Sequence, residues 1–329
     1  MTWRVLVTAR AFWVSGEEAE AALKAEGCEV VRSSRAGPLP EEDLIREMQG
    51  CQAVIASSDP YNARVFAGCP DLKVVVRCGV GTDSVDMNAA AAAGVIAANT
   101  PGAMSEAVAD FAFGMMLCLA RRLHEGDALM RSGAWNELPG SGVYDKTLGL
   151  VGVGRIGRAV AARSKGFRMR VLAHDPALAA VGAEGIEFTD LETLLRESDY
   201  ISVHAPATPE TAGMFDTAKF RRMKPTAFFI NTARGALVNE PDLIAALENK
   251  TIAGAALDVY SKEPLPADHP LRSAPRCLLQ PHNAFNSLES TKEMSRQSAL
   301  PIIDLLHGRR PENVCNPAVW DAHNLRIEL

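Results

Sequence analysis

A glycine-spaced turn between a predicted strand and a predicted helix constrains this chain more than any other feature. The apolar run 148–153 leads into Gly152-Val-Gly154-Arg-Ile-Gly157, and a helical pattern covers 155–165. The first glycine permits a tight turn, the second lets a pyrophosphate approach the backbone, and the third allows helix and strand to pack closely. The pyrophosphate would lie at the helix N-terminus, where unpaired N–H groups and the dipole attract anions. The turn therefore predicts a dinucleotide-binding α/β domain.

The same alternation of strands and helices extends over most of the chain. Apolar runs predict buried strands at 5–8, 30–31, 53–56, 74–76, 95–98, 148–153, 170–173, 200–204, 228–231, 254–258 and 277–279. Helical patterns lie between them at 17–26, 41–49, 85–93, 105–124, 155–165, 191–197 and 288–307. Strands that alternate with helices form parallel sheets covered on both faces. We therefore expect an α/β fold with two Rossmann-like or flavodoxin-like parallel-sheet domains and a cleft between them.

The length of 329 residues exceeds what one hydrophobic core usually organises. The glycine turn places the nucleotide domain in the second half, at 102–285. The final helix and the tail have no sheet of their own, so we expect them to return to the first half. This predicts a discontinuous substrate domain, 1–101 and 286–329.

Composition excludes several classes of function. The net charge is −6 and no basic run is present, so we expect no nucleic-acid partner. No apolar stretch approaches the roughly 18–20 residues that span a bilayer, so we expect no membrane insertion. The seven cysteines are scattered without a C-x-x-C pair, which predicts neither a disulfide framework nor a zinc site. A reducing cytoplasm and no metal fit this pattern best.

An acidic residue follows the strand after the glycine turn. Asp175 lies 18 residues beyond Gly157, where a carboxylate would accept hydrogen bonds from the adenosine ribose hydroxyls. The phosphate of NADP would be repelled there, and Pro176-Ala177-Leu178 offer no cation. NAD is therefore the predicted cofactor. The alternative is that Asp175 only starts an Asp-Pro loop.

Three later strands are followed by polar residues that could carry chemistry. Arg234 follows 228–231, Glu263 follows 254–258, and His282 follows 277–279. Carboxyl ends of parallel strands meet at one edge, where ligands bind in open α/β sheets. Reduction of a 2-keto acid requires a proton donor, a cation for the carboxylate and a hydride. His282, Arg234 and NADH would supply these, with Glu263 stabilising the protonated imidazole. Taken singly, each residue has a structural alternative: an ion pair for Arg234 and Glu263, and a buried histidine for His282.

Several motifs appear together in a fixed order, and they are more specific than the glycine turn alone. They are Arg77-Cys-Gly79-Val-Gly81-Thr-Asp83, Asn99-Thr-Pro101, the glycine turn, His204-Ala-Pro206, Asn231-Thr-Ala-Arg234-Gly235, Leu257-Asp258-Val, Glu263-Pro264 and Pro281-His282. With these motifs the chain resembles the D-isomer-specific 2-hydroxyacid dehydrogenase family over nearly its whole length.

The resemblance implies a role for each matching residue. Arg234, Glu263 and His282 match the catalytic residues, and the backbone of Val80 and Gly81 matches the loop that holds the substrate carboxylate. The implied cofactor-binding residues are Gly152, Gly154, Arg155, Ile156 and Gly157 at the pyrophosphate, Asp175 at the ribose, Ala205 and Pro206 beside the adenosine, and Ala233 and Asp258 near the nicotinamide. The long helix after Pro101 resembles the segment through which members form homodimers, so a homodimer is implied.

The substrate stays open, because two cues disagree. Arg77 resembles phosphoglycerate-type members, in which an arginine at this position holds a distal phosphate, so a 3-phosphoglycerate-like acid is implied. Phe285 instead resembles D-lactate-type members. Arg77 has a structural alternative, in which it pairs with Asp83 or Asp86 and braces the loop.

The resemblance has two other interpretations. Formate-type members carry Gln where this chain has Glu263, which counts against a formate or phosphite substrate. Corepressors with this fold sense NAD and keep the same three catalytic residues, but they carry disordered tails, whereas this sequence contains no low-complexity tract. We therefore expect the chain to be an enzyme.

Overall fold

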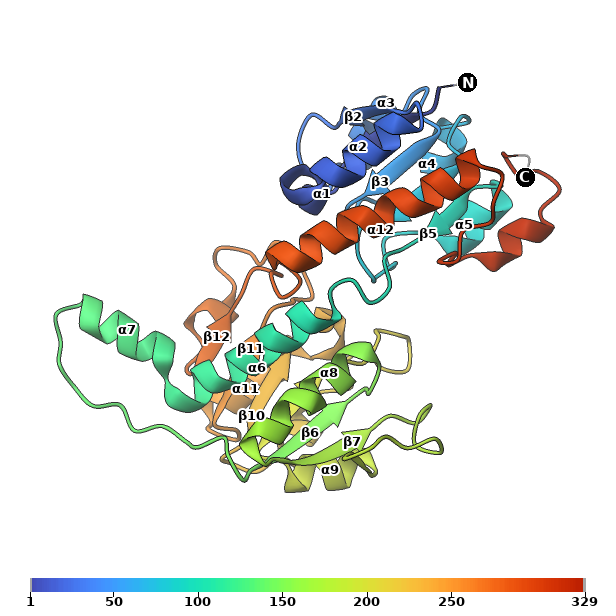
Figure 1. Cartoon of the computed structure of the whole chain (residues 1–329). Coiled ribbons are helices and arrows are strands. Elements are labelled where there is room, and N and C mark those ends of the chain that lie inside the picture. Colours follow the sequence, from blue (N-terminus) through green and yellow to red (C-terminus); the bar gives the residue numbers. More distant parts are fainter. Residues whose placement is uncertain (1, 328–329) are drawn as a thin grey trace. The chain divides into compact units, whose positions relative to one another are not determined.

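A computed structural model describes residues 2–327 of the chain. The chain divides into two compact units (Figure 1). Unit 1 comprises Met1–Met104 and Asn286–Leu329, and unit 2 comprises Ser105–Phe285. Unit 2 is therefore inserted between two stretches of chain that belong to unit 1.

Unit 1 is built on a parallel sheet in the order β2-β1-β3-β4-β5. The strands are β1 (Arg4–Val7), β2 (Glu29–Arg32), β3 (Ala53–Ala56), β4 (Val74–Arg77) and β5 (Ile96–Ala98). Val5 pairs with Val30 on one side and with Ala53 on the other. The central strands are short runs of Val, Ile and Ala that are buried on both faces, as parallel strands covered by helices must be. This strand order is the flavodoxin-like one.

Helices cover both faces of the sheet in unit 1. They are α1 (Arg10–Ser15), α2 (Glu17–Ala25), α3 (Glu41–Glu47), α4 (Ala63–Gly68), α5 (Met87–Ala92) and α12 (Leu288–Leu306). The last helix, α12, packs against α1, α2 and β4, although more than 250 residues separate it from α1 (Figure 1). The hydroxyls of Ser15 and Thr291 are 2.9 Å apart. The C-terminal helix therefore completes the unit that the N-terminus begins.

Unit 2 is built on a larger parallel sheet in the order β12-β11-β10-β9-β6-β7-β8. The strands are β6 (Thr147–Val151), β7 (Arg170–His174), β8 (Glu187–Phe188), β9 (Tyr200–Val203), β10 (Phe228–Asn231), β11 (Gly254–Leu257) and β12 (Cys277–Leu279). The chain runs outward from β6 to one edge, then returns to β9 and continues to the other edge. This order makes the ends of β6 and β9 the switch point, where doubly wound sheets bind dinucleotides.

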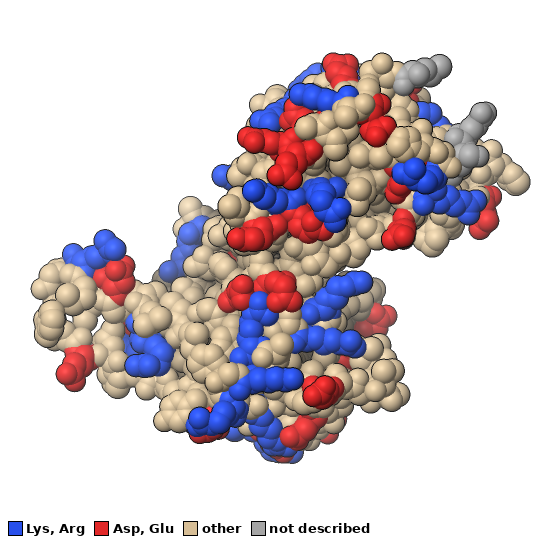
Figure 2. Space-filling model, viewed as in Figure 1, with Lys and Arg blue, Asp and Glu red and all other residues tan. Residues whose placement is uncertain are grey.

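Alternate residues of these strands bury opposite faces of the sheet. Phe228 and Ile230 join a core cluster with α6 (Ser105–Arg121) and α8 (Arg155–Ser164). Phe229 joins a second cluster with α9 (Leu191–Glu197), α10 (Thr217–Phe220) and α11 (Glu240–Glu248). On the surface, Arg163 of α8 lies 2.8 Å from Glu106 and 2.6 Å from Asp110 of α6. Basic and acidic side chains lie side by side over the visible face (Figure 2).

Helix α7 (Leu123–Arg131) is an exception, because none of its residues is buried. It and the segment that follows stand off from the rest of unit 2 (Figure 1). Its exposed apolar side chains include Leu123 and Met130, and Trp135 beyond the helix is 84% exposed.

The predicted parallel α/β fold with two sheets is confirmed, and so are most strand positions. The helix predicted over 105–124 forms as α6, but it ends at Arg121. Arg122 takes a left-handed backbone conformation (φ 53°) and separates α6 from α7. The pattern also missed α1, α4 and α10, which have four to six residues, and α11, which has nine. Among residues 2–327, no helix is both long and apolar enough to cross a membrane.

Candidate active site

The glycine turn has the geometry that a pyrophosphate site requires. Gly152 has a φ of +92°, and a Cβ there would lie 2.7 Å from the backbone nitrogen of Ala205. A Cβ on Gly157 would lie 2.3 Å from the carbonyl oxygen of Gly152, so this glycine lets α8 pack against the turn. A Cβ on Gly154 would meet nothing within 4 Å. The turn is therefore closed at its first and third glycines and open at the second.

The N-terminus of α8 begins at this open position. Gly154 is the N-cap residue, and no side chain caps the helix. Arg155 is exposed, while Ile156 is partly buried and packs against the core. The first N–H groups and the dipole of α8 therefore favour an anion at the space above Gly154.

Asp175 lies against the same turn. Its Oδ2 accepts a hydrogen bond from the backbone N–H of Val153 (2.8 Å), and its Oδ1 accepts one from Ala177 (3.1 Å). Ala205 and Pro206 follow β9, the strand beside β6. The structure thus brings Asp175, the glycine turn and Ala205-Pro206 to one edge of the unit 2 sheet, and this arrangement fits an adenosine and a pyrophosphate.

The predicted catalytic residues follow three neighbouring strands of the same sheet. Arg234 follows β10, Glu263 follows β11, and His282 follows β12. The Nδ1 atom of His282 lies 2.6 Å from Oε2 of Glu263. The other carboxylate oxygen, Oε1, accepts a hydrogen bond from the backbone N–H of Tyr260 (2.9 Å). Both oxygens of Glu263 are therefore held, and the imidazole has a fixed orientation.

The environment of Glu263 keeps this carboxyl ionised. Burial alone would raise the pKa of Glu263, but the hydrogen bonds from His282 and Tyr260 and the charges of His282 and Arg234 lower it below its ordinary value. The positive charge of Arg234 is thus close enough to act on Glu263. The side chain of His282 is 46% exposed, so the pair is accessible from solvent.

The side chain of Asn231 fixes the turn that carries Arg234 through two hydrogen bonds. Asn231, fully buried at the end of β10, accepts a hydrogen bond from the N–H of Ala233 (3.0 Å) and donates one to the carbonyl oxygen of Arg234 (2.9 Å). The guanidinium of Arg234 donates to the carbonyl oxygen of Ala233 (2.7 Å). This role of Asn231 was not predicted, although an Asn at a strand end is a common turn-forming residue.

Asp258 holds the turn that carries His282. Its carboxylate is fully buried and accepts hydrogen bonds from the N–H groups of Asn283 (2.7 Å) and Ala284 (2.8 Å). Burial raises the pKa of Asp258, and these two hydrogen bonds oppose the rise. His282 has a φ of +54°, a conformation that non-glycine residues rarely adopt. The contacts of Asp258 just after it help to fix that conformation, a role the sequence did not predict.

The predicted substrate loop lies in unit 1, after β4. Asn99 donates to the carbonyl oxygen of Val80 (2.9 Å), and the N–H of Thr100 donates to that of Gly79 (3.2 Å). Val80 is exposed and Gly81 is partly exposed. The Asn99-Thr-Pro101 motif therefore supports the loop that carries Val80 and Gly81.

Arg77, the last residue of β4, folds back over this loop. Its guanidinium donates to the carbonyl oxygen of Cys78. A Cβ on Gly79, whose φ is +151°, would lie 2.7 Å from a guanidinium nitrogen of Arg77. Arg77 thus contacts the backbone of the loop itself.

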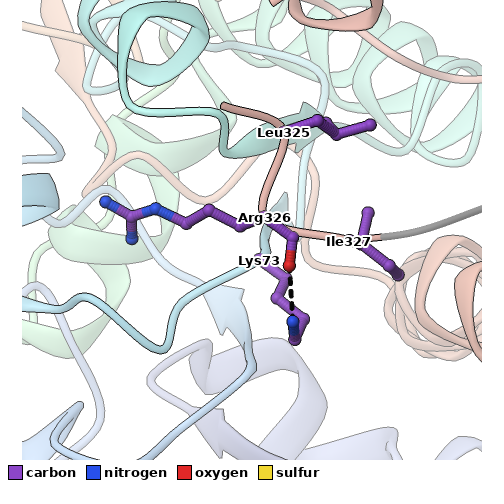
Figure 3. Close-up of a pocket in the computed structure, with 4 residues that line it drawn as sticks. All are labelled: Lys73, Leu325, Arg326 and Ile327. Carbon is purple, nitrogen blue, oxygen red and sulfur yellow. Dashed lines mark hydrogen bonds between the residues drawn. The ribbon is translucent and has the colours of Figure 1, made fainter. Parts of the chain in front are cut away.

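A hollow elsewhere in unit 1 is unrelated to these residues. It is lined by Lys73, Leu325, Arg326 and Ile327 (Figure 3). Lys73 donates to the backbone oxygen of Arg326. The Arg326 guanidinium donates to the carbonyl oxygens of Phe66, Cys69 and Leu72. This hollow lies where β4 begins, whereas open parallel sheets bind ligands beyond the ends of their strands.

A doubly wound sheet with an open glycine turn and a histidine–glutamate pair at one edge is typical of a dinucleotide-dependent oxidoreductase. Comparison with known proteins makes this more specific. The model of the D-isomer specific 2-hydroxyacid dehydrogenase, NAD binding domain, matches residues 113–284. The chain is 40% identical to the glyoxylate reductase of Korarchaeum cryptofilum, over 86% of this chain and 88% of the relative.

Other relatives agree. The chain is 36% identical to the D-3-phosphoglycerate dehydrogenase of Archaeoglobus fulgidus, over 84% of this chain but only 54% of the relative. A crystal structure of a protein from Thermus thermophilus superposes with a TM-score of 0.87 and 36% identity, covering 95% of this chain and 99% of that one. This chain therefore belongs to the D-isomer specific 2-hydroxyacid dehydrogenase family. It is an NAD-dependent oxidoreductase of 2-hydroxy and 2-keto acids, as the motifs predicted.

Proposed function

We propose that His282 is the acid–base catalyst of this enzyme, that Glu263 orients it, and that Arg234 binds the carboxylate of the substrate. The 2.6 Å contact between Nδ1 of His282 and Glu263 supports this proposal best. Because Nδ1 faces the carboxylate, Nε2 is the nitrogen that can serve the substrate oxygen. Three neighbouring strands carry the three residues to one edge of the sheet, where the reacting atoms would lie.

The chemistry assigned to these residues is a proton transfer beside a hydride transfer. The nicotinamide cofactor, when bound, would supply the hydride as NADH for reduction and accept it as NAD+ for oxidation. During reduction, protonated His282 gives its Nε2 proton to the keto oxygen as negative charge develops there. During oxidation, neutral His282 removes the hydroxyl proton. Glu263, an anion throughout, stabilises the imidazolium in both directions.

We propose that unit 2 holds NAD as the resemblance implies. Gly152, Gly154, Arg155, Ile156 and Gly157 would bind the pyrophosphate. Asp175 would bind the ribose and disfavour the phosphate of NADP, and Ala205 and Pro206 would line the adenosine site. Ala233 and Asp258 would border the nicotinamide, with Asp258 acting through the turn that carries His282.

The substrate domain is proposed as 1–101 with 286–329, and the NAD domain as 102–285. Val80 and Gly81 would bind the substrate carboxylate through their backbone. We propose a small keto acid as the substrate. Arg77 would bind a distal anion or polar group of that substrate, as in a 3-phosphoglycerate-like acid. The contacts of Arg77 with Cys78 and Gly79 support the second candidate, in which Arg77 braces the loop.

We also propose that the enzyme is a cytoplasmic homodimer. Helix α7 has no buried residue, and the apolar side chains of Leu123, Met130 and Trp135 are exposed on or just beyond it. Exposed apolar surface of this kind commonly marks an interface.

The experiment measures NADH oxidation with glyoxylate, pyruvate and a dianionic keto acid as substrates, across a pH series. We expect turnover of at least one substrate. His282→Gln should lower kcat by roughly 10²–10⁴-fold without a comparable change in NADH binding.

In Glu263→Gln, the loss of reduction with rising pH should begin at a lower pH, because the imidazolium has lost its anion. Arg234→Ala should mainly raise KM for the keto acid.

Two results would contradict these assignments. A wild-type pH profile in Glu263→Gln would leave Glu263 with a structural role only, and unchanged kcat in His282→Gln would remove the proposed catalyst. The same assay on Arg77→Leu separates its two candidate roles. A loss confined to the dianion indicates recognition of a distal charge, whereas equal losses on all substrates indicate bracing of the loop.

A further inference from the structure

A buried glutamate outside the proposed catalytic set organises a second hydrogen-bond cluster in unit 2. Glu240 is the first residue of α11 and is only 6% exposed. Its Oε1 accepts a hydrogen bond from the N–H of Ser261 (2.6 Å), and its Oε2 accepts one from the Ser261 hydroxyl (2.8 Å). Nε2 of His269 lies 3.3 Å from the same Oε2. A buried carboxylate needs such donors, and here they come from outside its own helix.

The cluster lies directly beside the segment that supports Glu263. Ser261 follows Tyr260, whose N–H donates to Oε1 of Glu263. Gly235, on the chain that leads into α11, lies so close to this segment that a Cβ would be 1.9 Å from the carbonyl carbon of Tyr260. The chain entering α11 and the segment 260–263 are therefore packed together, with Glu240 fixing the latter through Ser261.

The segment 260–263 has a buried anchor at its start. Ser261 and Glu263 are both exposed. The buried anchor is Tyr260, whose hydroxyl donates to the carbonyl oxygen of Gln280 (2.8 Å). That contact fixes the start of the segment, and Glu240 fixes the next residue. Two successive anchors determine where Glu263 can point.

We propose that Glu240 is a positioning residue, which holds Ser261 so that the carboxylate of Glu263 stays aligned with Nδ1 of His282. This inference rests on the proposed roles of Glu263 and His282. Glu240 touches neither substrate nor cofactor in this scheme. It acts through two residues of backbone and one hydrogen bond from Tyr260.

The test compares Glu240→Gln with Glu248→Gln, which removes the same charge from an exposed position at the other end of α11. The amide keeps the size of the side chain but places an NH₂ group against the donors of Ser261. We expect Glu240→Gln to lower kcat/KM for keto acid reduction roughly ten- to a hundredfold, as small misplacements of catalytic groups do. The fall of activity with rising pH should begin at a lower pH, in the same direction as for Glu263→Gln. NADH affinity should change less than twofold, and Glu248→Gln should match the wild type.

The double variant Glu240→Gln/Glu263→Gln separates positioning from general destabilisation. If Glu240 acts through Glu263, the double variant should show the pH profile of Glu263→Gln alone. A lower Tm in Glu240→Gln with a wild-type pH profile would overturn the proposal, and so would additive shifts in the double variant. If Glu263→Gln itself leaves the pH profile unchanged, the proposed function of Glu263 has failed rather than the role of Glu240.

Two milder changes keep the proposal testable if Glu240→Gln folds poorly. Ser261→Ala removes the hydroxyl contact and keeps the N–H contact, so it should give a smaller shift of the pH profile in the same direction. Glu240→Asp keeps the charge and should retain more activity than Glu240→Gln. A wild-type profile in Ser261→Ala and equal activities of the two Glu240 variants would contradict the proposal.

Discussion

At the residue scale, the two ionisable partners of the proposed catalytic pair have different tasks because their surroundings differ. Glu263 has both oxygens held and a pKa below the ordinary value, so its anionic form is favoured. A carboxyl group held as an anion is a poor proton donor to the substrate. That leaves His282 as the member of the pair that can exchange a proton with the substrate, and its exposed side chain permits exchange with solvent.

His204 is the residue whose titration should affect stability rather than catalysis. Burial lowers the pKa of His204 to about 4, and its Nε2 lies 2.9 Å from the hydroxyl of Ser202. Between pH 6.5 and pH 4 the unfolded chain therefore binds a proton that the folded chain does not. Stability should decrease as pH falls through this window, by at most about 3 kcal/mol for this single group.

The measurement is urea unfolding between about pH 4 and pH 7, which spans this window. His204→Gln should flatten the dependence of the unfolding free energy on pH, while His323→Gln, a change at an exposed histidine, should leave it unchanged. Parallel curves for wild type and His204→Gln would show that His204 does not titrate differently in the folded and unfolded states.

Site residues that directly follow a strand could be predicted from the sequence, because parallel strands bring their carboxyl ends to one edge of the sheet. Arg234, Glu263 and His282 were found in this way, and the structure places all three at the edge of the unit 2 sheet. Glu240 could not be found from the sequence. Its partners are 21 and 29 residues away in irregular segments, whose mutual approach depends on tertiary packing.

At the scale of elements, two glycines in the turn between β6 and α8 have different tasks. Gly157 lets the helix pack closely, and Gly154 leaves space for the pyrophosphate. Gly157→Ala would place a methyl group 2.3 Å from the carbonyl oxygen of Gly152, so α8 would have to shift. We expect a loss of roughly 1–3 kcal/mol of stability together with weaker NADH binding. Gly154→Ala would place its methyl group in open space, so it should bind NADH more weakly with nearly unchanged stability.

These outcomes are measured by urea unfolding and by titration of NADH fluorescence. If Gly154→Ala binds NADH as tightly as the wild type, the pyrophosphate does not lie above this glycine. If Gly157→Ala unfolds at the same urea concentration as the wild type, the close approach of α8 is not needed for stability.

Short buried strands bounded by turn residues were predictable, whereas some helices and helix ends were not. The runs that form β10 and β12 were placed at their observed bounds, because an apolar run between turn residues has few other interpretations. The break at Arg122 has no glycine or proline to mark it. Helix α11 was missed although Asn239 caps it and Pro241 lies in its first turn, and these are usual signals for a helix start.

At the scale of the whole molecule, substitutions in the segment 123–135 test the proposed homodimer. Replacing both Met130 and Trp135 with Glu puts charges on side chains that are 54% and 84% exposed. We expect this variant to stay folded and to shift from dimer to monomer, because buried charges without partners disrupt an apolar interface. Light scattering after size exclusion measures the mass.

The matched control is Val181→Glu, another exposed apolar position of unit 2 that lies outside this segment. It should leave the mass unchanged. A wild-type protein that elutes as a monomer, or a double variant that remains dimeric, would contradict the proposed interface.

The insertion of unit 2 into unit 1 has a consequence for synthesis on the ribosome. When Phe285 has been added, every residue of unit 2 exists, but α12 has not yet been made. The N-terminal strands, although translated first, must wait for α12 to cover the face that it shares with α1 and α2. We therefore expect unit 2 to be the first part of the nascent chain to reach a protease-resistant state, even though its residues leave the exit tunnel second.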